Sequence, residues 1–233
     1  MGTILEAKGV SKSFGGIKAL NALDLKLERG RIMGLLGPNG SGKTTFLKVI
    51  AGLLRPDSGE ISIDQNPVGL KTKSLVSYLP DRNTLYPWMK VQDAIEFYSD
   101  LFEDFDEDKA RELLELMKIK EVAPVKSLSK GMQEKLNLCL VFARRARLYV
   151  LDEPLGGTDP VAREKIIDLI ITNFREDSSI LLTTHLVGNI ERLFDDAAFI
   201  CKGEIVLQGN AEELRLDRGR SIDEIYREVF KDE

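Results

Sequence analysis

Residues 37–45, GPNGSGKTT, have the clearest chemical signature in the chain. Gly37, Gly42, Lys43 and Thr44 fit the spacing G-x-x-x-x-G-K-[ST], whose glycines let backbone N–H groups approach a phosphate closely. Lys43 can then reach the β- and γ-phosphates of a nucleotide, and the Thr44 hydroxyl can ligate magnesium. The loop follows a predicted buried strand and precedes a predicted helix, whose N-terminus attracts anions. The sequence therefore predicts a site for nucleotide phosphates.

Two adjacent carboxylates, Asp152 and Glu153, end the apolar segment 147–153, RLYVLDE. If this segment is a strand of a doubly wound sheet, its carboxyl end lies where ligands bind. Asp152 suits the coordination shell of magnesium, whereas Glu153 faces the other side and can orient and deprotonate an attacking water. Lys43 and the metal would hold the charge of the departing phosphoryl group. The pair therefore indicates phosphoryl transfer to water.

The chain has one histidine, His185, which follows the apolar run 178–184. A lone histidine in such a place is more often structural than catalytic. Imidazole is nevertheless the side chain most easily set for proton and phosphate chemistry near pH 7. Position alone leaves both interpretations of His185 open.

These residues need a scaffold, and strand and helix patterns alternate along the chain. Antiparallel, half-buried strands are predicted in the first 30 residues, where 20–28 alternates between apolar and polar side chains. Residues 84–145 are predicted to be helical, as an insertion into a mostly parallel sheet covered by helices. The other predicted strands are 31–37, 59–64, 75–80, 147–153, 178–184 and two within 197–209 that turn at Lys202–Gly203; the helices are 44–54, 91–102, 106–119, 160–174, 186–194 and 221–230. The apolar stripe of the last helix predicts docking, on its own core or on a second subunit.

Composition limits the classes of function. The 233 residues are 43% hydrophobic and 30% charged, with a net charge of -5, which is ordinary for a globular protein and does not suggest nucleic-acid binding. The two cysteines, Cys139 and Cys201, show no metal-ligand spacing. No apolar run reaches the roughly 18 to 20 residues that span a bilayer, and the N-terminus lacks a signal-peptide core. We therefore expect a cytoplasmic chain that acts on a membrane only through another polypeptide.

Three further segments have alternative interpretations. The acidic run 103–109, EDFDEDK, is predicted to be a solvated linker with acids at a helix N-terminus, and 144–147, RRAR, a helix C-terminal turn. Residues 85–89, LYPWM, include aromatic residues and methionine next to a flexible loop, which favours a docking surface over a local apolar cluster.

Taken in order, the phosphate loop and the segments LSKGMQEKLNL, LYVLDEP, GGTDP and LTTH resemble those of the ATP-binding-cassette (ABC) ATPases. The resemblance covers nearly the whole chain. It implies one α/β ABC ATPase domain over 1–233 with a P-loop NTPase core and a mostly parallel sheet. The implied parts are the core with an N-terminal antiparallel β subdomain at 1–83 and 146–210, an inserted helical signature subdomain at 84–145, and a C-terminal helical extension at 211–233.

The same resemblance implies roles for individual residues. Glu153, His185 and Lys43 would be catalytic, and His185 would contact the γ-phosphate and hold Glu153 and the attacking water in place. Metal ligands would be Thr44, Asp81 and Asp152, and the cofactors ATP and Mg2+. The residues implied to contact the nucleotide are Phe14 (stacked on adenine), Gly37, Pro38, Asn39, Gly40, Ser41, Gly42, Lys43, Thr44, Thr45, Asp81, Ser129, Gly131 and Asp159.

The resemblance further implies a dimer with composite sites. Ser129 can cap the helix that follows it, and Gly131 leaves backbone amides open to an anion; in the family this helix N-terminus faces ATP bound by the other subunit. Thr158 and Asp159 lie in the loop that crosses to the partner.

Three residues depart from the family pattern. Lys130 and Met132 replace the usual glycine and glutamine of the signature sequence. Asp81 replaces a glutamine that touches magnesium or water and reports the nucleotide state to the membrane partner. Aspartate is shorter and charged, so it can bind magnesium directly or reach less far.

Three kinds of ABC protein fit these motifs. The first is the ATPase subunit of a transporter whose permease is a separate transmembrane chain, peripheral on the inner face of the cell membrane. The second is a soluble ATPase acting on DNA or ribosomes, and the third is a nucleotide-binding regulator with little turnover. A single cassette without a long coiled-coil insertion favours the transporter, and the presence of both Glu153 and His185 disfavours the regulator. The C-terminal run GRSIDEIYREVF is similar to bacterial export ATPases for drugs or antibiotic peptides.

Overall fold

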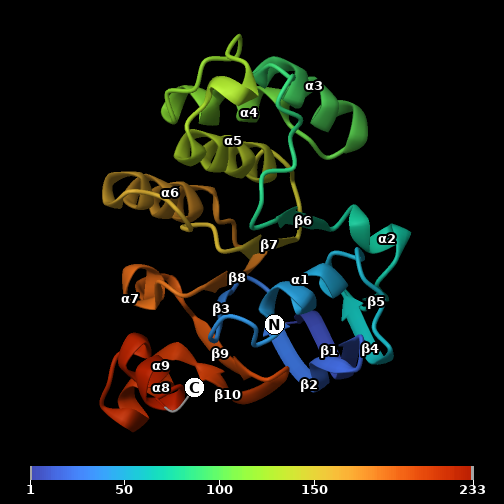
Figure 1. Cartoon of the computed structure of the whole chain (residues 1–233), viewed down its shortest axis with the longest axis vertical. Coiled ribbons are helices and arrows are strands. Elements are labelled where there is room, and N and C mark those ends of the chain that lie inside the picture. The colour runs from blue at the N-terminus through green and yellow to red at the C-terminus, as the bar shows by residue number, and fades with distance from the viewer. Residues whose placement is uncertain (1, 232–233) are drawn as a thin grey trace.

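The computed structural model describes residues 2–231, and its strands form two sheets (Figure 1). The first sheet is antiparallel throughout, as predicted for the N-terminal region. It contains, in the order β2-β1-β4-β5, strands β1 (Thr3–Phe14), β2 (Ile17–Glu28), β4 (Ser58–Ile63) and β5 (Asn66–Pro67). In β2, Leu23, Leu25 and Leu27 are buried and alternate with more exposed polar residues, because one face of the sheet packs on the core.

The second sheet is mostly parallel and includes the strands that lead into the phosphate loop, Asp152 and His185. All its neighbouring strands are parallel except β9 and β10. In the order β10-β9-β3-β8-β7-β6, it contains β3 (Ile32–Leu36), β6 (Val76–Leu79), β7 (Leu148–Asp152), β8 (Ser179–Thr184), β9 (Asp196–Cys201) and β10 (Glu204–Asn210).

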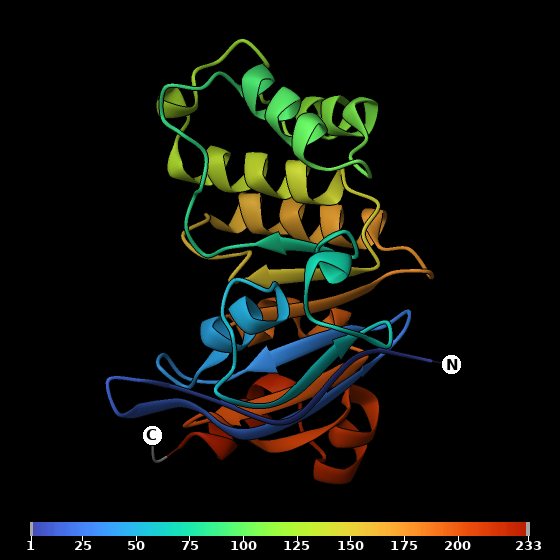
Figure 2. The ribbon, with the colours of Figure 1, turned by 90° about the vertical axis from the view of Figure 1, so that its right-hand side faces the viewer.

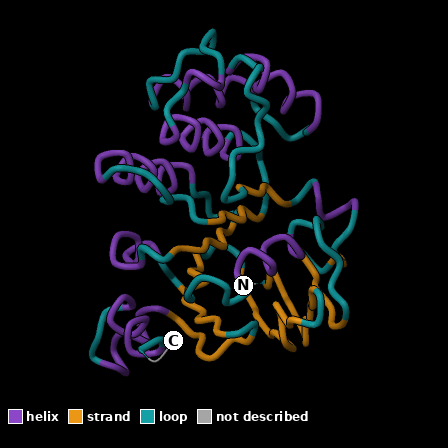
Figure 3. The backbone as a smooth tube through the Cα atoms, in the orientation of Figure 1, coloured by secondary structure: helices purple, strands orange, loops and turns teal. Residues whose placement is uncertain are grey.

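Helices surround this sheet, as the view coloured by secondary structure shows (Figure 3). The turned view shows α5 and α6 in successive rows between the uppermost helices and the strands (Figure 2). The helices are α1 (Lys43–Ile50), α2 (Leu70–Lys73), α3 (Val91–Leu101), α4 (Glu107–Leu116), α5 (Lys130–Phe142), α6 (Pro160–Asn173), α7 (Val187–Ile190), α8 (Ala211–Arg218) and α9 (Ile222–Val229), with 3-10 turns η1 (Val125–Ser127) and η2 (Glu191–Leu193).

Strands β3 and β7 are buried at every position, on both faces of the sheet, and are therefore apolar at nearly every position. Met33 and Leu35 of β3 enter a core shared with α1 and the antiparallel sheet, whereas Ile32 and Leu36 enter a larger core with the other helices. The strand ends that carry polar side chains are therefore held from both sides.

The arginine-rich segment 144–147 does not form the predicted helix C-terminal turn. Helix α5 ends at Phe142, and the side chain of Arg144 is only 3% exposed. Its guanidinium pairs with Asp104, which lies in the acidic run predicted to be solvated. Asp106 of that run does cap a helix, since its side chain accepts a hydrogen bond from the Lys109 N–H.

Two other segments differ from the prediction. Residues 186–194 form the short helix α7 followed by η2 rather than one continuous helix. In the segment 85–89, Leu85 and Met89 are buried in the core, while Tyr86 and Trp88 are exposed and stack with ring centroids 5.5 Å apart. An apolar-rich sequence does not distinguish residues that anchor a loop from those that the loop presents to solvent.

Candidate nucleotide-binding site

The phosphate loop, residues 37–45, joins β3 to α1 at the carboxyl end of the parallel sheet. Neighbouring backbone clamps it on two sides. A Cβ at Gly37 would lie 2.3 Å from the carbonyl oxygen of Ile200, and one at Gly42 would lie 2.4 Å from that of Ala19. Gly42 also has a φ of +110°, which side chains rarely adopt. The loop conformation therefore requires glycine at both positions.

Lys43 begins α1 and is almost fully buried, at 6% exposed. Its Nζ donates to the carbonyl oxygens of Gly37 at 2.7 Å and Pro38 at 3.0 Å. Burial lowers the pKa of Lys43, and the carboxylates of Glu153 and Asp152 oppose that shift. The ammonium group is thus already directed to the inside of the loop, where a phosphate would meet it.

The carboxylate of Asp152 lies at the end of β7 and is 1% exposed. One of its oxygens accepts a hydrogen bond from the Thr183 hydroxyl at 2.8 Å, and the Thr44 hydroxyl is near enough to oppose the rise that burial causes in the pKa of the carboxyl group. Among the described residues, its other oxygen is a buried atom without a hydrogen-bond partner. Burial raises the pKa of Asp152, so a cation beside it would stabilise the ionised form.

Glu153 and His185 form a pair at the carboxyl ends of β7 and β8. The backbone N–H of His185 donates to Glu153 Oε2 at 3.2 Å, and His185 Nδ1 lies 2.8 Å from the same oxygen. Since an ionised carboxylate only accepts, the imidazole nitrogen is the donor. Glu153 has a φ of +50°, which is uncommon outside glycine, and its N–H is held by the Thr183 hydroxyl at 3.0 Å. The strained backbone aims the carboxylate at the histidine.

A cavity of about 460 Å³ brings Lys43, Glu153 and His185 together, whereas the predicted metal ligand Asp152 does not line it. Its lining also includes Ala19, Glu134, Gly156 and Gly157, which had no predicted functional role, and it places Lys130 near its own chain's loop. Burial raises the pKa of Glu134, the Lys130 ammonium opposes that shift, and Asp81 adds to it, so Asp81 and Glu134 lie close together. In the sequence, only the i, i+4 spacing of Lys130 and Glu134 indicated that these two side chains would form an ion pair. The predicted residues that line the cavity are Asn39, Gly40, Gly42, Lys43, Thr44, Thr45, Asp81, Glu153 and His185.

Seven residues predicted to contact nucleotide do not line this cavity: Gly37, Pro38 and Ser41 belong to the phosphate loop itself, and the other four lie elsewhere. Phe14 is half exposed at the end of β1, with Lys12 Nζ 5.6 Å from its ring centroid. Ser129 caps α5 by accepting the Met132 N–H at 3.3 Å, and Asp159 caps α6 by accepting the Ala162 N–H at 2.9 Å. Gly131 lies in the first turn of α5, where a Cβ would meet nothing within 4 Å.

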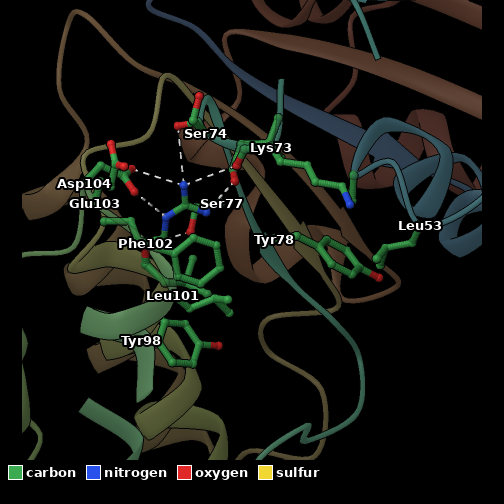
Figure 4. A pocket seen from close by; sticks show the side chains of 14 residues that line it. Leu53, Lys73, Ser74, Ser77, Tyr78, Tyr98, Leu101, Phe102, Glu103 and Asp104 are labelled. Carbon is green, nitrogen blue, oxygen red and sulfur yellow. Dashed lines mark hydrogen bonds and ion pairs between the residues drawn. The ribbon is translucent and has the colours of Figure 1, made fainter. Parts of the chain in front are cut away.

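A second, larger cavity of about 720 Å³ lies where α3 and α5 meet the parallel sheet (Figure 4). We call it the subdomain groove. Its lining includes the side chains of Leu53, Lys73, Tyr78, Tyr98, Leu101, Phe102, Glu103, Asp104 and Arg144. Leu53 and Leu101 are each 59% exposed, so apolar surface faces solvent there. Lys73 and Glu103 place opposite charges on its lining.

No helix among residues 2–231 is both long enough and apolar enough to cross a bilayer. Within the same residues, no three His, Cys, Asp or Glu side chains form a metal-binding group. Magnesium bound beside a nucleotide needs fewer protein ligands, because it is usually held by one or two carboxylates together with substrate phosphates and water. The unpartnered oxygen of Asp152, next to the Thr44 hydroxyl, fits that mode of binding.

Comparison with known proteins adds independent evidence. Residues 20–156 match the family model described as ABC transporter. The chain is 35% identical over 216 residues to the uncharacterized ABC transporter ATP-binding protein YhaQ of Bacillus subtilis, covering 91% of this chain and 72% of that protein. It is 30% identical over 236 residues to the daunorubicin resistance ATP-binding protein DrrA3 of Streptomyces coeruleorubidus, covering 97% and 75% respectively. A solved ATP-binding subunit of an ABC transporter superposes with a TM-score of 0.89 at 27% identity, covering 97% of this chain and 99% of that one.

Proposed function

The chain belongs to the ABC transporter family as an ATP-hydrolysing ATP-binding subunit, and we propose that two such cassettes close on ATP and Mg2+ to drive a separate membrane permease that exports its cargo. The main support for ATP hydrolysis is the Glu153–His185 pair, which lines the same cavity as Lys43 of the phosphate loop. A base, a hydrogen-bond donor that orients it and a phosphate-binding cation are the groups that ATP hydrolysis requires.

The described side chains divide the chemistry among themselves. Lys43 exchanges its two loop carbonyls for phosphate oxygens and balances their charge. Glu153 accepts a proton from the attacking water, and His185 holds that carboxylate in place. Thr44, Asp152 and Asp81 would hold Mg2+, which neutralises charge on the transferring phosphoryl group.

The cassette needs a second copy, or a related subunit, to complete the site. Ser129 and Gly131 do not line the cavity of their own chain, yet the N-terminus of α5 offers backbone N–H groups to an anion. We propose that these groups face the γ-phosphate on the partner, so that hydrolysis removes the contacts that hold the dimer closed. Thr158 and Asp159 would lie at the same contact.

The permease would bind at the exposed Tyr86–Trp88 pair and at the subdomain groove. The groove offers apolar surface from Leu53 and Leu101 where helices α3 and α5 meet the sheet. A permease segment bound there would contact both the helices and the sheet, so it would move when the helices move relative to the sheet. Binding there would place the chain on the inner face of the membrane. Export is supported by the likeness to a protein named for daunorubicin resistance.

A pull-down tests this function against the alternative, an ABC ATPase acting on DNA or ribosomes. The Glu153→Gln protein, which should bind ATP without hydrolysing it, is recovered from its native cells in detergent with ATP. We expect a dimer together with a protein of several transmembrane helices, and less of that protein when Trp88 is also replaced by alanine. Ribosomes or DNA without a membrane protein would contradict the transporter function.

A further inference from the structure

The C-terminal helix α9 packs on its own chain, directly against the segment that follows His185. Ile222 and Ile225 of α9 are fully buried, in the same core as Val187 and Ile190 of α7. Helix α7 begins two residues after His185. The terminal helix therefore reaches the catalytic histidine through one short element.

Glu191 joins α7 to both C-terminal helices by hydrogen bonds. Its side-chain Oε2 accepts the backbone N–H of Asp223 at 2.9 Å, which is an N–H of the first turn of α9. Its backbone carbonyl accepts Arg215 Nη2 of α8 at 2.7 Å. The first turn of a helix leaves N–H groups without intrahelical partners, so the Glu191 carboxylate is a well-matched acceptor for α9.

Gly188, three residues before Glu191, faces the same residue of α9. A Cβ at Gly188 would lie 3.4 Å from the Asp223 carboxyl carbon, which is van der Waals contact, so α7 and α9 are closely packed there. Tyr226, one turn further along α9, is near enough to the active site for the Glu153 carboxylate to contribute, after burial, to its raised pKa.

His185 itself has little to hold it in place. Its side chain is 52% exposed, and its contacts with Glu153 are the 2.8 Å and 3.2 Å hydrogen bonds to one carboxylate oxygen. The position of its ring therefore depends on its backbone, which is fixed on one side by β8 and on the other by α7.

We propose that α9 is a positioning element for catalysis: through Glu191 it holds α7, and through α7 it sets the place of His185 against Glu153. The inference rests on the proposed role of His185. Misplacement of a catalytic group by about 1 Å from a distant change can cost roughly 100-fold in rate. Loosening this contact should therefore slow hydrolysis without weakening the binding of ATP.

The test compares Glu191→Ala with a conservative variant and a matched control on the full chain. Glu191→Ala should lower kcat about tenfold or more while the KM for ATP stays within about twofold. Glu191→Gln keeps an acceptor oxygen for the Asp223 N–H and should restore most of kcat. Glu228→Ala, on α9, removes exposed ion pairs to Arg218 at the end of α8 and to Arg220 in the loop that follows, and should leave kcat unchanged.

A double-mutant cycle separates positioning from general loss of structure. In the His185→Ala background, Glu191→Ala should cause no further loss, because both changes remove the same contribution. Losses that multiply would refute the proposal. Full activity of His185→Ala alone would instead refute the proposed role of the histidine, whatever Glu191 does.

A measurement without turnover is also available, because His185 is the only histidine of the chain. The imidazole C–H signals in an NMR spectrum of untagged protein therefore belong to this residue alone. We expect them to shift or broaden in Glu191→Ala and to stay in place in Glu191→Gln and Glu228→Ala. Unchanged signals in Glu191→Ala would show that α9 does not position the ring.

Discussion

Replacing Arg144 by alanine should destabilise the fold by about 3 kcal/mol or more. The guanidinium is 3% exposed and makes a two-bond pair with Asp104, Nε to Oδ1 at 3.0 Å and Nη2 to Oδ2 at 3.2 Å. It also donates to the Val76 carbonyl oxygen at 2.7 Å and lies 3.9 Å from the centroid of the Phe102 ring. The side chain thus ties the loop after α3 to strand β6.

The magnitude follows from what the truncation leaves behind. Removing one partner of a buried ion pair typically costs about 3–5 kcal/mol, because the remaining charge is uncompensated. Asp104 is 24% exposed and can be partly hydrated, which favours the lower end of that range. The unpaired Val76 carbonyl adds about 1 kcal/mol or more. Arg144→Lys should recover only part of the loss, because lysine restores the positive charge but its ammonium group cannot form the two-bond pair.

Urea unfolding followed by circular dichroism gives the free energy of unfolding of each variant. Arg145→Ala is the matched control, because the neighbouring Arg145 is 68% exposed and its pair with Asp106 lies at the surface. Its loss should cost no more than about 1 kcal/mol. An Arg144→Ala protein as stable as Arg145→Ala would refute the buried-pair reasoning.

Three other substitutions test the site. Glu153→Gln should bind ATP normally and lose roughly 100- to 10,000-fold in kcat, measured by phosphate release, because the amide is not a base; normal turnover would exclude Glu153 as that base. Asp81→Gln should keep measurable ATPase activity, since glutamine still offers an oxygen to magnesium, and complete loss of turnover with intact ATP binding would contradict this. Gly203→Ala should lower thermal stability and weaken ATP binding, measured by fluorescence titration: Gly203 has a φ of +84°, and a Cβ there would lie 2.8 Å from the Ala19 carbonyl oxygen, so unchanged binding would show that the turn does not support the phosphate loop.

Local patterns in the sequence were enough to predict the phosphate loop, its flanking strand and helix, and the two-sheet α/β fold. These features depend on residues close together in the chain, such as the spacing of Gly37, Gly42 and Lys43. The terminal helix was predicted as well, although its partner was left open between its own core and a second subunit. The structure shows it on its own core, against α7.

Contacts between distant residues were not predicted. Arg144 and Asp104 each lie in a run of like charges, and such runs are usually solvated; only the fold places one arginine and one aspartate together inside. Likewise, Glu134 and Asp81 line the same cavity because α5 packs on β6, and no periodicity within either segment predicts that packing.

The order of strands in the parallel sheet also has a consequence for synthesis on the ribosome. Strand β3 lies between β8 and β9, which are made much later, and the backbone N–H of Gly203 donates to the Ser41 carbonyl oxygen of the phosphate loop at 2.9 Å. The loop therefore emerges long before the strands that clamp it, and non-local pairing of this kind is slow to form. We expect chains truncated before residue 196 to fail to bind immobilised ATP, whereas the full chain is retained. A nascent chain would then be unable to bind nucleotide until translation is nearly complete.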